Sequence, residues 1–280
     1  MNSRQLLKRA AEELRQAGIE DAEVDASVLL SHVTGRPPLS LRLGIDFEPD
    51  EADQARFRAL LTRRLNREPL QYILGTQPFC GRAFMVDERV LIPRPETELL
   101  AEKAVAALRT AGPGARALDL CCGSGCLAVT LALEVPSARV EACDLSADAL
   151  EVTAENARRL GASLRLLQGD LWQAVGDTRY DVIVSNPPYI PSEDCAHLQP
   201  EVLREPTLAL DGGSDGLALY RRIAEGAVRH LLPGGALLME LGIGEDKAVR
   251  ALLEAQGLTE IAVWPDLNGI ARMIGARLPR

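Results

Sequence analysis

The clearest chemical signal in the chain is four consecutive residues, Asn186-Pro187-Pro188-Tyr189, which directly follow the apolar run 180–185. A residue before proline is held extended, and proline has a fixed φ and no N–H, so the stretch is stiff and its prolines offer only carbonyl acceptors. Asn186 adds a side-chain carbonyl, and Tyr189 adds a flat face with a polar tip. A planar NH₂ group has two N–H donors that need acceptors and a π face that can be stacked. The tetrapeptide therefore predicts a rigid clamp for an amino or amide nitrogen, with an ordinary proline turn as the weaker alternative.

A glycine-rich turn predicts a nucleotide site. Residues 121–125, Cys-Cys-Gly-Ser-Gly, follow a second apolar run and open a helical pattern. Glycines at such a turn allow a ligand to approach the backbone closely. Asp144 ends the next apolar run, where a carboxylate can accept hydrogen bonds from both hydroxyls of a ribose. A tight strand-to-helix turn without a ligand is the alternative.

The residues alone leave the cofactor open. Gly123-x-Gly125-x-x-Ala128 fits the fingerprint of nicotinamide-dependent oxidoreductases, although this pattern alone is weak. Asp119, two residues before the turn, suits a cationic amino-acid cofactor better than a pyrophosphate, which it would repel. Asp170 follows the third predicted strand and is expected to bond an adenine amino group, with Leu171 packed on the ring. A turn aspartate with its apolar neighbour in the core explains this last pair equally well.

These residues need a scaffold, and the apolar periodicity predicts an α/β one. Residues 1–75 have only helical patterns, with Ser3 as a candidate first cap and 37–38 in a connector. A hairpin is expected over 77–86, and from 116 onward strands alternate with helices. This alternation predicts a mostly parallel sheet covered on both faces, and a turn at 267–269 predicts an antiparallel hairpin at its edge. We therefore expect a helical domain (1–75), a hairpin linker (76–92) and a nucleotide-binding domain (93–280).

Composition restricts the class of protein. The 280 residues are 47% hydrophobic and 25% charged, as in globular proteins. A net charge of −9 argues against sequence-independent nucleic-acid binding, because phosphates demand a cationic surface. The absence of a long apolar run, the charged first residues and the six unpatterned cysteines predict a cytoplasmic protein with no membrane contact and no metal site.

One local feature opposes this acidic balance. Five arginines crowd the third predicted helix of the first 75 residues, and they are Arg56, Arg58, Arg63, Arg64 and Arg67. A solvated helix face is the favoured interpretation, and a stripe that binds a partner is the alternative.

The motifs together carry a family resemblance. The glycine-rich turn, the acid at the end of the second strand and the Asn-Pro-Pro-Tyr tetrapeptide resemble those of class I S-adenosylmethionine-dependent methyltransferases that act on amino or amide nitrogen. Residues 67–75, 91–100 and 205–223 narrow the resemblance to the HemK/PrmC family of release-factor glutamine methyltransferases, and these blocks span nearly the whole chain. The resemblance implies a Rossmann-like, mostly parallel seven-stranded sheet, S-adenosylmethionine as cofactor, and the glutamine of the Gly-Gly-Gln motif of peptide-chain release factors as substrate.

The resemblance also implies residue roles. The candidate cofactor-binding residues are Asp119, Cys121, Cys122, Gly123, Ser124, Gly125, Asp144, Leu145, Asp170, Leu171 and Asn186. Asn186, Pro187 and Tyr189 are the catalytic candidates, and with Pro188 they form the substrate clamp. The two adjacent cysteines replace residues that are often small or hydroxylic, which leaves backbone binding intact and a side-chain contact from Cys122 open. A nucleic-acid base methyltransferase would use the same tetrapeptide, but it would need a basic groove and a means of flipping the base.

Overall fold

The computed structural model describes residues 1–43 and 46–280, which divide into two compact units. The first unit comprises residues 1–75 together with 200–204, and the second comprises 76–199 together with 205–280. No helix among the described residues is long and apolar enough to cross a membrane.

The first unit is helical, as expected. Its helices are α1 (Ser3–Gln16), α2 (Ala22–Thr34), α3 (Pro38–Arg42), α4 (Glu51–Leu65) and α5 (Leu70–Leu74). Two details differ from the expectation. Asn2, rather than Ser3, caps α1, because its side chain accepts from the Gln5 N–H while the Gln5 side chain accepts from the Asn2 N–H. The predicted connector contains α3, since proline fits the first turn of a helix.

The arginines at positions 56–67 are paired within this unit. Arg56 pairs with Asp53, Arg58 with Glu13, Arg63 with Glu68, Arg64 with Asp25 and Glu201, and Arg67 with Glu201. Their charges are thus balanced by acids of the same unit, which argues against a partner-binding stripe. The solvated-face interpretation does not hold for Arg64, which is buried against Asp25.

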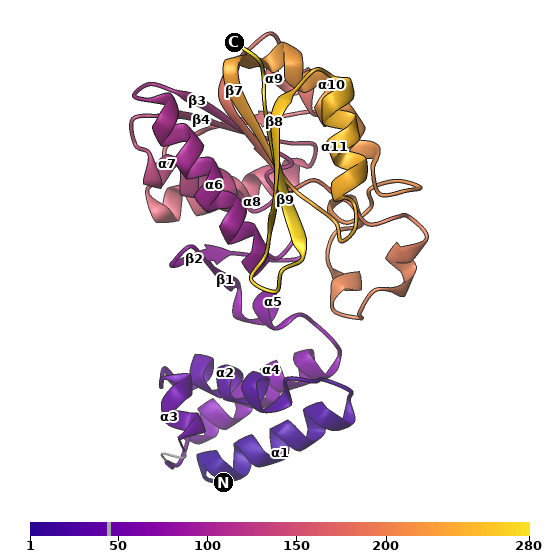
Figure 1. Ribbon diagram of the computed structural model, residues 1–280. Helices are drawn as coiled ribbons and strands as arrows, with labels where there is room; N and C mark the ends of the chain where they lie inside the picture. The colour runs from indigo at the N-terminus through magenta and orange to yellow at the C-terminus, as the bar shows by residue number, and fades with distance from the viewer. Residues whose placement is uncertain (44–45) are drawn as a thin grey trace. The chain divides into compact units, whose positions relative to one another are not determined.

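The second unit contains a seven-stranded sheet with the order β5-β4-β3-β6-β7-β9-β8. Its strands are β3 (Arg116–Leu120), β4 (Arg139–Asp144), β5 (Arg165–Gln168), β6 (Tyr180–Ser185), β7 (Leu231–Glu240), β8 (Thr259–Pro265) and β9 (Ala271–Arg277). Strands β3 to β7 pair in parallel, whereas β9 is antiparallel to both β7 and β8. The expected class I methyltransferase sheet with an antiparallel C-terminal hairpin is confirmed (Figure 1).

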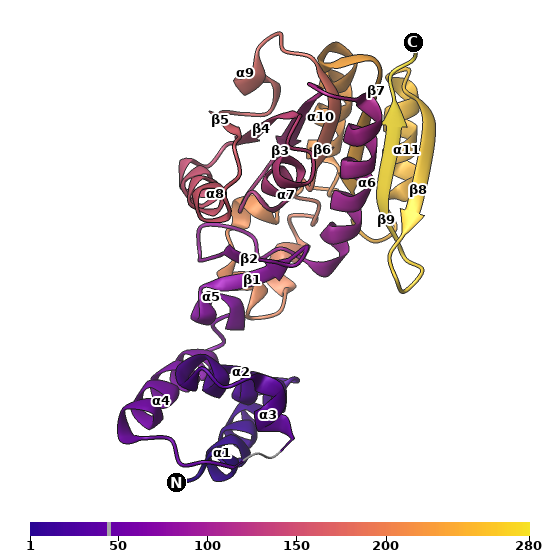
Figure 2. The ribbon, with the colours of Figure 1, turned by 90° about the vertical axis from the view of Figure 1, so that its left-hand side faces the viewer.

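Helices cover both faces of this sheet (Figures 1 and 2). They are α6 (Pro95–Ala111), α7 (Cys126–Glu134), α8 (Ala147–Leu160), α9 (Trp172–Val175), α10 (Ala218–His230) and α11 (Asp246–Ala255), with 3₁₀ turns at Asp194–His197 and Thr207–Ala209. A further 3₁₀ turn, Val202–Arg204, belongs to the first unit. Apolar residues of α6, α7 and α8 form one core with the sheet, and those of α10 and α11 form the other.

The short hairpin of β1 (Thr76–Phe79) and β2 (Arg82–Met85) packs into the first of these cores. Phe79 and Phe84 are both fully buried there and meet edge to face with ring centroids 5.8 Å apart. The hairpin is therefore part of the larger unit.

Candidate active site

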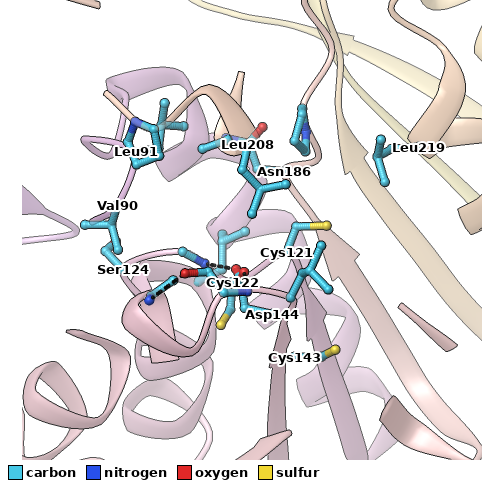
Figure 3. A pocket seen from close by; sticks show the side chains of 18 of the residues that line it. Val90, Leu91, Cys121, Cys122, Ser124, Cys143, Asp144, Asn186, Leu208 and Leu219 are labelled. Atoms are coloured by element: carbon cyan, nitrogen blue, oxygen red, sulfur yellow. Dashed lines mark hydrogen bonds between the residues drawn. The ribbon is translucent and has the colours of Figure 1, made fainter. Parts of the chain in front are cut away.

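A cavity of about 220 Å³ lies in the second unit, at the carboxyl ends of the parallel strands. Ten of the residues singled out in the sequence line it, namely Cys121, Cys122, Gly123, Ser124, Asp144, Leu145, Asp170, Leu171, Asn186 and Pro188. Figure 3 shows Cys121, Cys122, Asp144 and Asn186 around this space. Asp119, Gly125, Pro187 and Tyr189 are not among the lining residues. Parallel strands end at one edge of the sheet, and this edge brings the glycine-rich turn and the tetrapeptide together.

Two side chains of helix α8 hold the glycine-rich turn through hydrogen bonds to its backbone. The Thr153 hydroxyl donates to the Gly123 carbonyl at 2.8 Å, and Asn156 Nδ2 donates to the Ser124 carbonyl at 2.9 Å. Gly125 has φ +77°, and a Cβ at this position would lie 2.6 Å from Thr153 Cγ2. Only glycine fits here, because a side chain would collide with α8 as well as strain the backbone. Sequence reasoning missed Thr153 and Asn156, although both are polar residues on the buried face of a helix.

Asp144 is fixed by the backbone around it. Its Oδ2 accepts from the Gly123 N–H and its Oδ1 from the Ser146 N–H, both at 2.9 Å. Burial raises its pKa above the ordinary value, while these hydrogen bonds oppose the shift. A carboxylate has about four acceptor positions, so Asp144 keeps capacity for a hydroxyl in the cavity.

Asp119 is fully buried beneath the turn. Its Oδ2 accepts from the Ala128 N–H at 3.0 Å, in the first turn of α7, and its Oδ1 has no hydrogen-bond partner among the described residues. Desolvation raises its pKa to about 8. In this position the side chain joins the end of β3 to the start of α7 and thereby shapes the turn, rather than forming the cavity wall.

The cysteines near the cavity are neutral thiols. Burial raises the pKa of Cys121 and Cys122 well above the usual range and that of Cys143 to about 12. The Cys122 thiol lies 3.6 Å from the Thr153 hydroxyl, so it contacts α8. Across residues 1–43 and 46–280, no group of three or more His, Cys, Asp or Glu side chains is arranged to hold a metal ion.

Asp170 pairs with Arg222 of α10 at 2.8 Å. Both residues line the cavity. Leu171 is buried and has φ +50° and ψ −119°, a positive-φ conformation that is unusual for leucine, at the start of α9.

Asn186 brings its amide to the cavity from the end of β6. Its Nδ2 donates to Thr97 Oγ1 of α6 at 3.3 Å. Tyr189 lies beside Arg272 of β9, whose Nη2 donates to the tyrosine hydroxyl at 3.2 Å and whose guanidinium carbon is 5.6 Å from the ring centroid. The guanidinium of Arg272 therefore contacts Tyr189 at both its hydroxyl and its ring.

Two loops complete the cavity wall, and sequence reasoning gave their residues no role. They contribute Arg89, Val90, Leu91 and Pro93 from one side, and Pro206, Leu208, Ala209 and Asp211 from the other. Glu205 fastens them together, because it accepts from the Ile92 N–H at 2.9 Å and pairs with Arg94 at 2.5 Å. Except for Arg89 and Val90, these residues lie in the blocks 91–100 and 205–223 that carry the family resemblance, which was the available signal.

Comparison with known proteins agrees with this architecture. Residues 5–75 match the family described as PrmC N-terminal domain, and residues 96–213 match the methyltransferase small domain family. A methyltransferase structure from Pyrococcus furiosus covers 82% of this chain and 100% of its own at a TM-score of 0.55. It is 18% identical to this chain, so it shows the fold alone.

Two relatives align over nearly all of their length. The release factor glutamine methyltransferase of Cereibacter sphaeroides is 48% identical over 282 residues, which cover 100% of this chain and 99% of that protein. The protein of the same description from Geobacter sulfurreducens is 45% identical over 266 residues, with coverages of 95% and 93%. With both its helical part and its sheet domain matched, the chain belongs to the release factor glutamine methyltransferase family.

Proposed function

We propose that the protein transfers a methyl group from S-adenosylmethionine to N5 of the glutamine in the Gly-Gly-Gln motif of peptide-chain release factors. The observation that carries this proposal is the full-length similarity to relatives described by that activity, in a chain whose Asn186 and Asp144 line one cavity. The dinucleotide-like glycine pattern then belongs to a methyltransferase, and the nicotinamide alternative is set aside.

The cavity wall offers candidate partners for the ribose and the adenine of S-adenosylmethionine. We assign the ribose hydroxyls to Asp144, whose oxygens are already oriented by two backbone N–H groups. Asp170 and Leu171 are assigned to the adenine, supported by their place in the cavity wall. When bound, S-adenosylmethionine supplies an electrophilic methyl group on a sulfonium centre.

The chain's own contribution is to hold the substrate nitrogen. An amide nitrogen is a poor nucleophile, because its lone pair is delocalised into the carbonyl. In our proposal Asn186 Oδ1 and the Pro187 carbonyl each accept one amide hydrogen, which favours a nitrogen with a more localised lone pair. Positioning in the cavity then supplies most of the rate enhancement. The transfer releases S-adenosylhomocysteine and leaves an extra proton on the methylated nitrogen. This protonated amide is very acidic and gives the proton to water, so the proposal assigns no general base.

The direct test is methyl transfer from labelled S-adenosylmethionine to a purified release factor, with tRNA, rRNA and DNA in parallel reactions. Mass spectrometry should find one added methyl group on the Gly-Gly-Gln glutamine and none when that glutamine is replaced by Glu, which lacks the amide donors. Methylation of adenine or guanine instead would favour the base-methyltransferase alternative.

A matched pair of variants tests the clamp. Asn186→Ala should abolish transfer while leaving cofactor affinity mostly intact, since its assigned bonds go to the substrate. Asn186→Asp keeps an acceptor but adds a charge, and it should be severely impaired too. Near-normal turnover in either variant would contradict the clamp.

We further propose that the helical unit supplies docking area for the release factor, in the cytoplasm where translation termination takes place. An isolated clamp buries too little surface for a specific complex. The fragment for testing this begins at Thr76, because Phe79 and Phe84 are core residues of the larger unit. It should bind cofactor and methylate the intact factor poorly, whereas full activity would give the helices a stabilising role only.

A further inference from the structure

Asn186 is the first of three polar side chains that are joined by hydrogen bonds, and the proposed methyl transfer gives the other two no role. Asn186 Nδ2 donates to Thr97 Oγ1 at 3.3 Å, and Thr97 Oγ1 donates to Glu240 Oε2 at 2.5 Å. The three residues come from the end of β6, the first turn of α6 and the last position of β7. Thr97 and Glu240 are 1% and 0% exposed, so the chain runs from the cavity wall into the core.

The burial of Glu240 lowers the stability of the fold. Its Oε1 has no hydrogen-bond partner among the described residues, and the nearest cation, Arg272, lies 3.6 Å away. Burial raises its pKa to about 7, with Glu96 adding to the shift while Thr97, Arg272 and Arg94 oppose it. A buried carboxylate that is incompletely hydrogen-bonded destabilises a fold, so its position needs a reason other than packing.

The two ends of the tetrapeptide both connect to this carboxylate. Asn186 reaches it through Thr97, and Tyr189 reaches it through Arg272, which contacts the tyrosine and Glu240. The sequence analysis gave no role to the carboxylate at the end of β7.

The chain of hydrogen bonds has a direction. An ionised carboxylate can only accept, and a threonine hydroxyl has a single hydrogen. Because Thr97 gives that hydrogen to Glu240, its oxygen can only accept from Asn186. While Glu240 is ionised, the amide of Asn186 must therefore turn its NH₂ toward Thr97 and its Oδ1 away from it.

We propose that Thr97 and Glu240 are positioning residues, which fix the Asn186 amide so that Oδ1, and not the NH₂ group, is presented to the substrate nitrogen. The inference rests on the proposed function and deepens it. A flipped amide would present two donors to a substrate that itself donates, so the orientation decides whether the clamp works.

Isosteric variants separate this role from packing. Thr97→Val removes the acceptor of the Asn186 NH₂ group, so the amide is held neither in place nor in one orientation. Loss of one hydrogen bond of about 1.4 kcal/mol predicts that kcat falls about 10-fold. In Glu240→Gln, Arg272 attracts the new carbonyl and leaves the NH₂ against Thr97. The threonine then donates to Asn186 Oδ1, which reverses the amide, and kcat should fall about 100-fold. Thr97→Ser keeps the hydroxyl and should stay within about threefold of the wild type.

Thr130→Val is the matched control, since Thr130 on α7 is equally buried and its hydroxyl has no partner among the described residues. The full-length variants are assayed at pH 8.5, above the Glu240 pKa, for kcat, KM toward the release factor and affinity for S-adenosylhomocysteine. The proposal expects losses in kcat for the first two variants, with KM and affinity within about twofold and with activity retained in Thr97→Ser and Thr130→Val.

Two results would overturn the proposal. One is a kcat of Thr97→Val or Glu240→Gln that matches the Thr130→Val control. The other is that cofactor affinity and thermal stability fall together with kcat, and that Thr97→Ser shows the same losses. This result would show that the two residues serve packing. Wild-type transfer to the glutamine is measured in the same assay, so failure of the proposed function would show separately, as an inactive wild type.

Discussion

Removal of the Asp144 carboxylate should weaken cofactor binding strongly. The side chain lines the cavity and is held by the N–H groups of Gly123 and Ser146. A hydrogen bond to a charged group contributes about 1.5–3 kcal/mol, so Asp144→Ala should lower the affinity for S-adenosylhomocysteine roughly 10- to 150-fold. Alanine is a cleaner change than asparagine, whose NH₂ group would face one of the two backbone donors.

Isothermal titration calorimetry measures this affinity directly. Asp148→Ala provides a charge-matched control, because Asp148 is an exposed acid of the first turn of α8 and does not line the cavity. The control should stay within about twofold of the wild type. Equal affinity of Asp144→Ala and the wild type would remove this carboxylate from the cofactor site and refute the assignment of the ribose.

Three further predictions concern stability. Gly125→Ala should lower the free energy of unfolding by about 1–3 kcal/mol more than Gly123→Ala in urea titrations, because both have positive φ but only the former collides with α8. Burial raises the Glu240 pKa from 4.5 to about 7, so the folded wild type holds a proton that the unfolded chain has lost. Its stability should therefore fall by about 2–3 kcal/mol between pH 5 and pH 8, and Glu240→Gln should lack this fall. Glu201→Ala unpairs Arg67 and leaves Arg64 with Asp25 alone, so it should raise hydrogen exchange in residues 1–75 by the equivalent of about 2–3 kcal/mol, whereas the surface-pair variant Glu12→Ala of the same unit should cost less than about 1.

Much of the fold was predictable because its signals are local. Each parallel strand is a short apolar run, and glycine or proline marks most helix boundaries, as at Gly35 and Pro95. Conversely, α3 was missed because Pro37 and Pro38 look like a connector, although proline also suits a first helical turn. The alternation of strands and helices then fixed the class of sheet, with the hairpin at its edge.

The cavity wall was predictable where a motif sits at a strand end. Asp144 ends β4 and Asn186 directly follows β6, and parallel strands end at one edge. The supporting groups could not be found in this way. Thr97 and Glu240 are 143 residues apart and meet only through tertiary packing. Thr97 lies in the block 91–100 that carries the family resemblance, but no local pattern there predicts that its hydroxyl meets Glu240.

Asp119 and Glu240 together show how the irregular segments of this site are held. Backbone pairing stops where β3 and β7 end, so the loops that follow lose the hydrogen bonds of the sheet. A buried acid at or near each end takes over, with Asp119 accepting from the first turn of α7 and Glu240 from Thr97 in the first turn of α6. Each is costly, because burial raises the pKa of both carboxyl groups toward neutrality and each has one oxygen without a hydrogen bond in the part of the chain described. An apolar residue could fill either position at less cost to stability, but it could not accept a hydrogen bond from the group that it must orient. The stability lost at these two acids is therefore best understood as the cost of holding the glycine-rich turn and the Asn186 amide in single orientations.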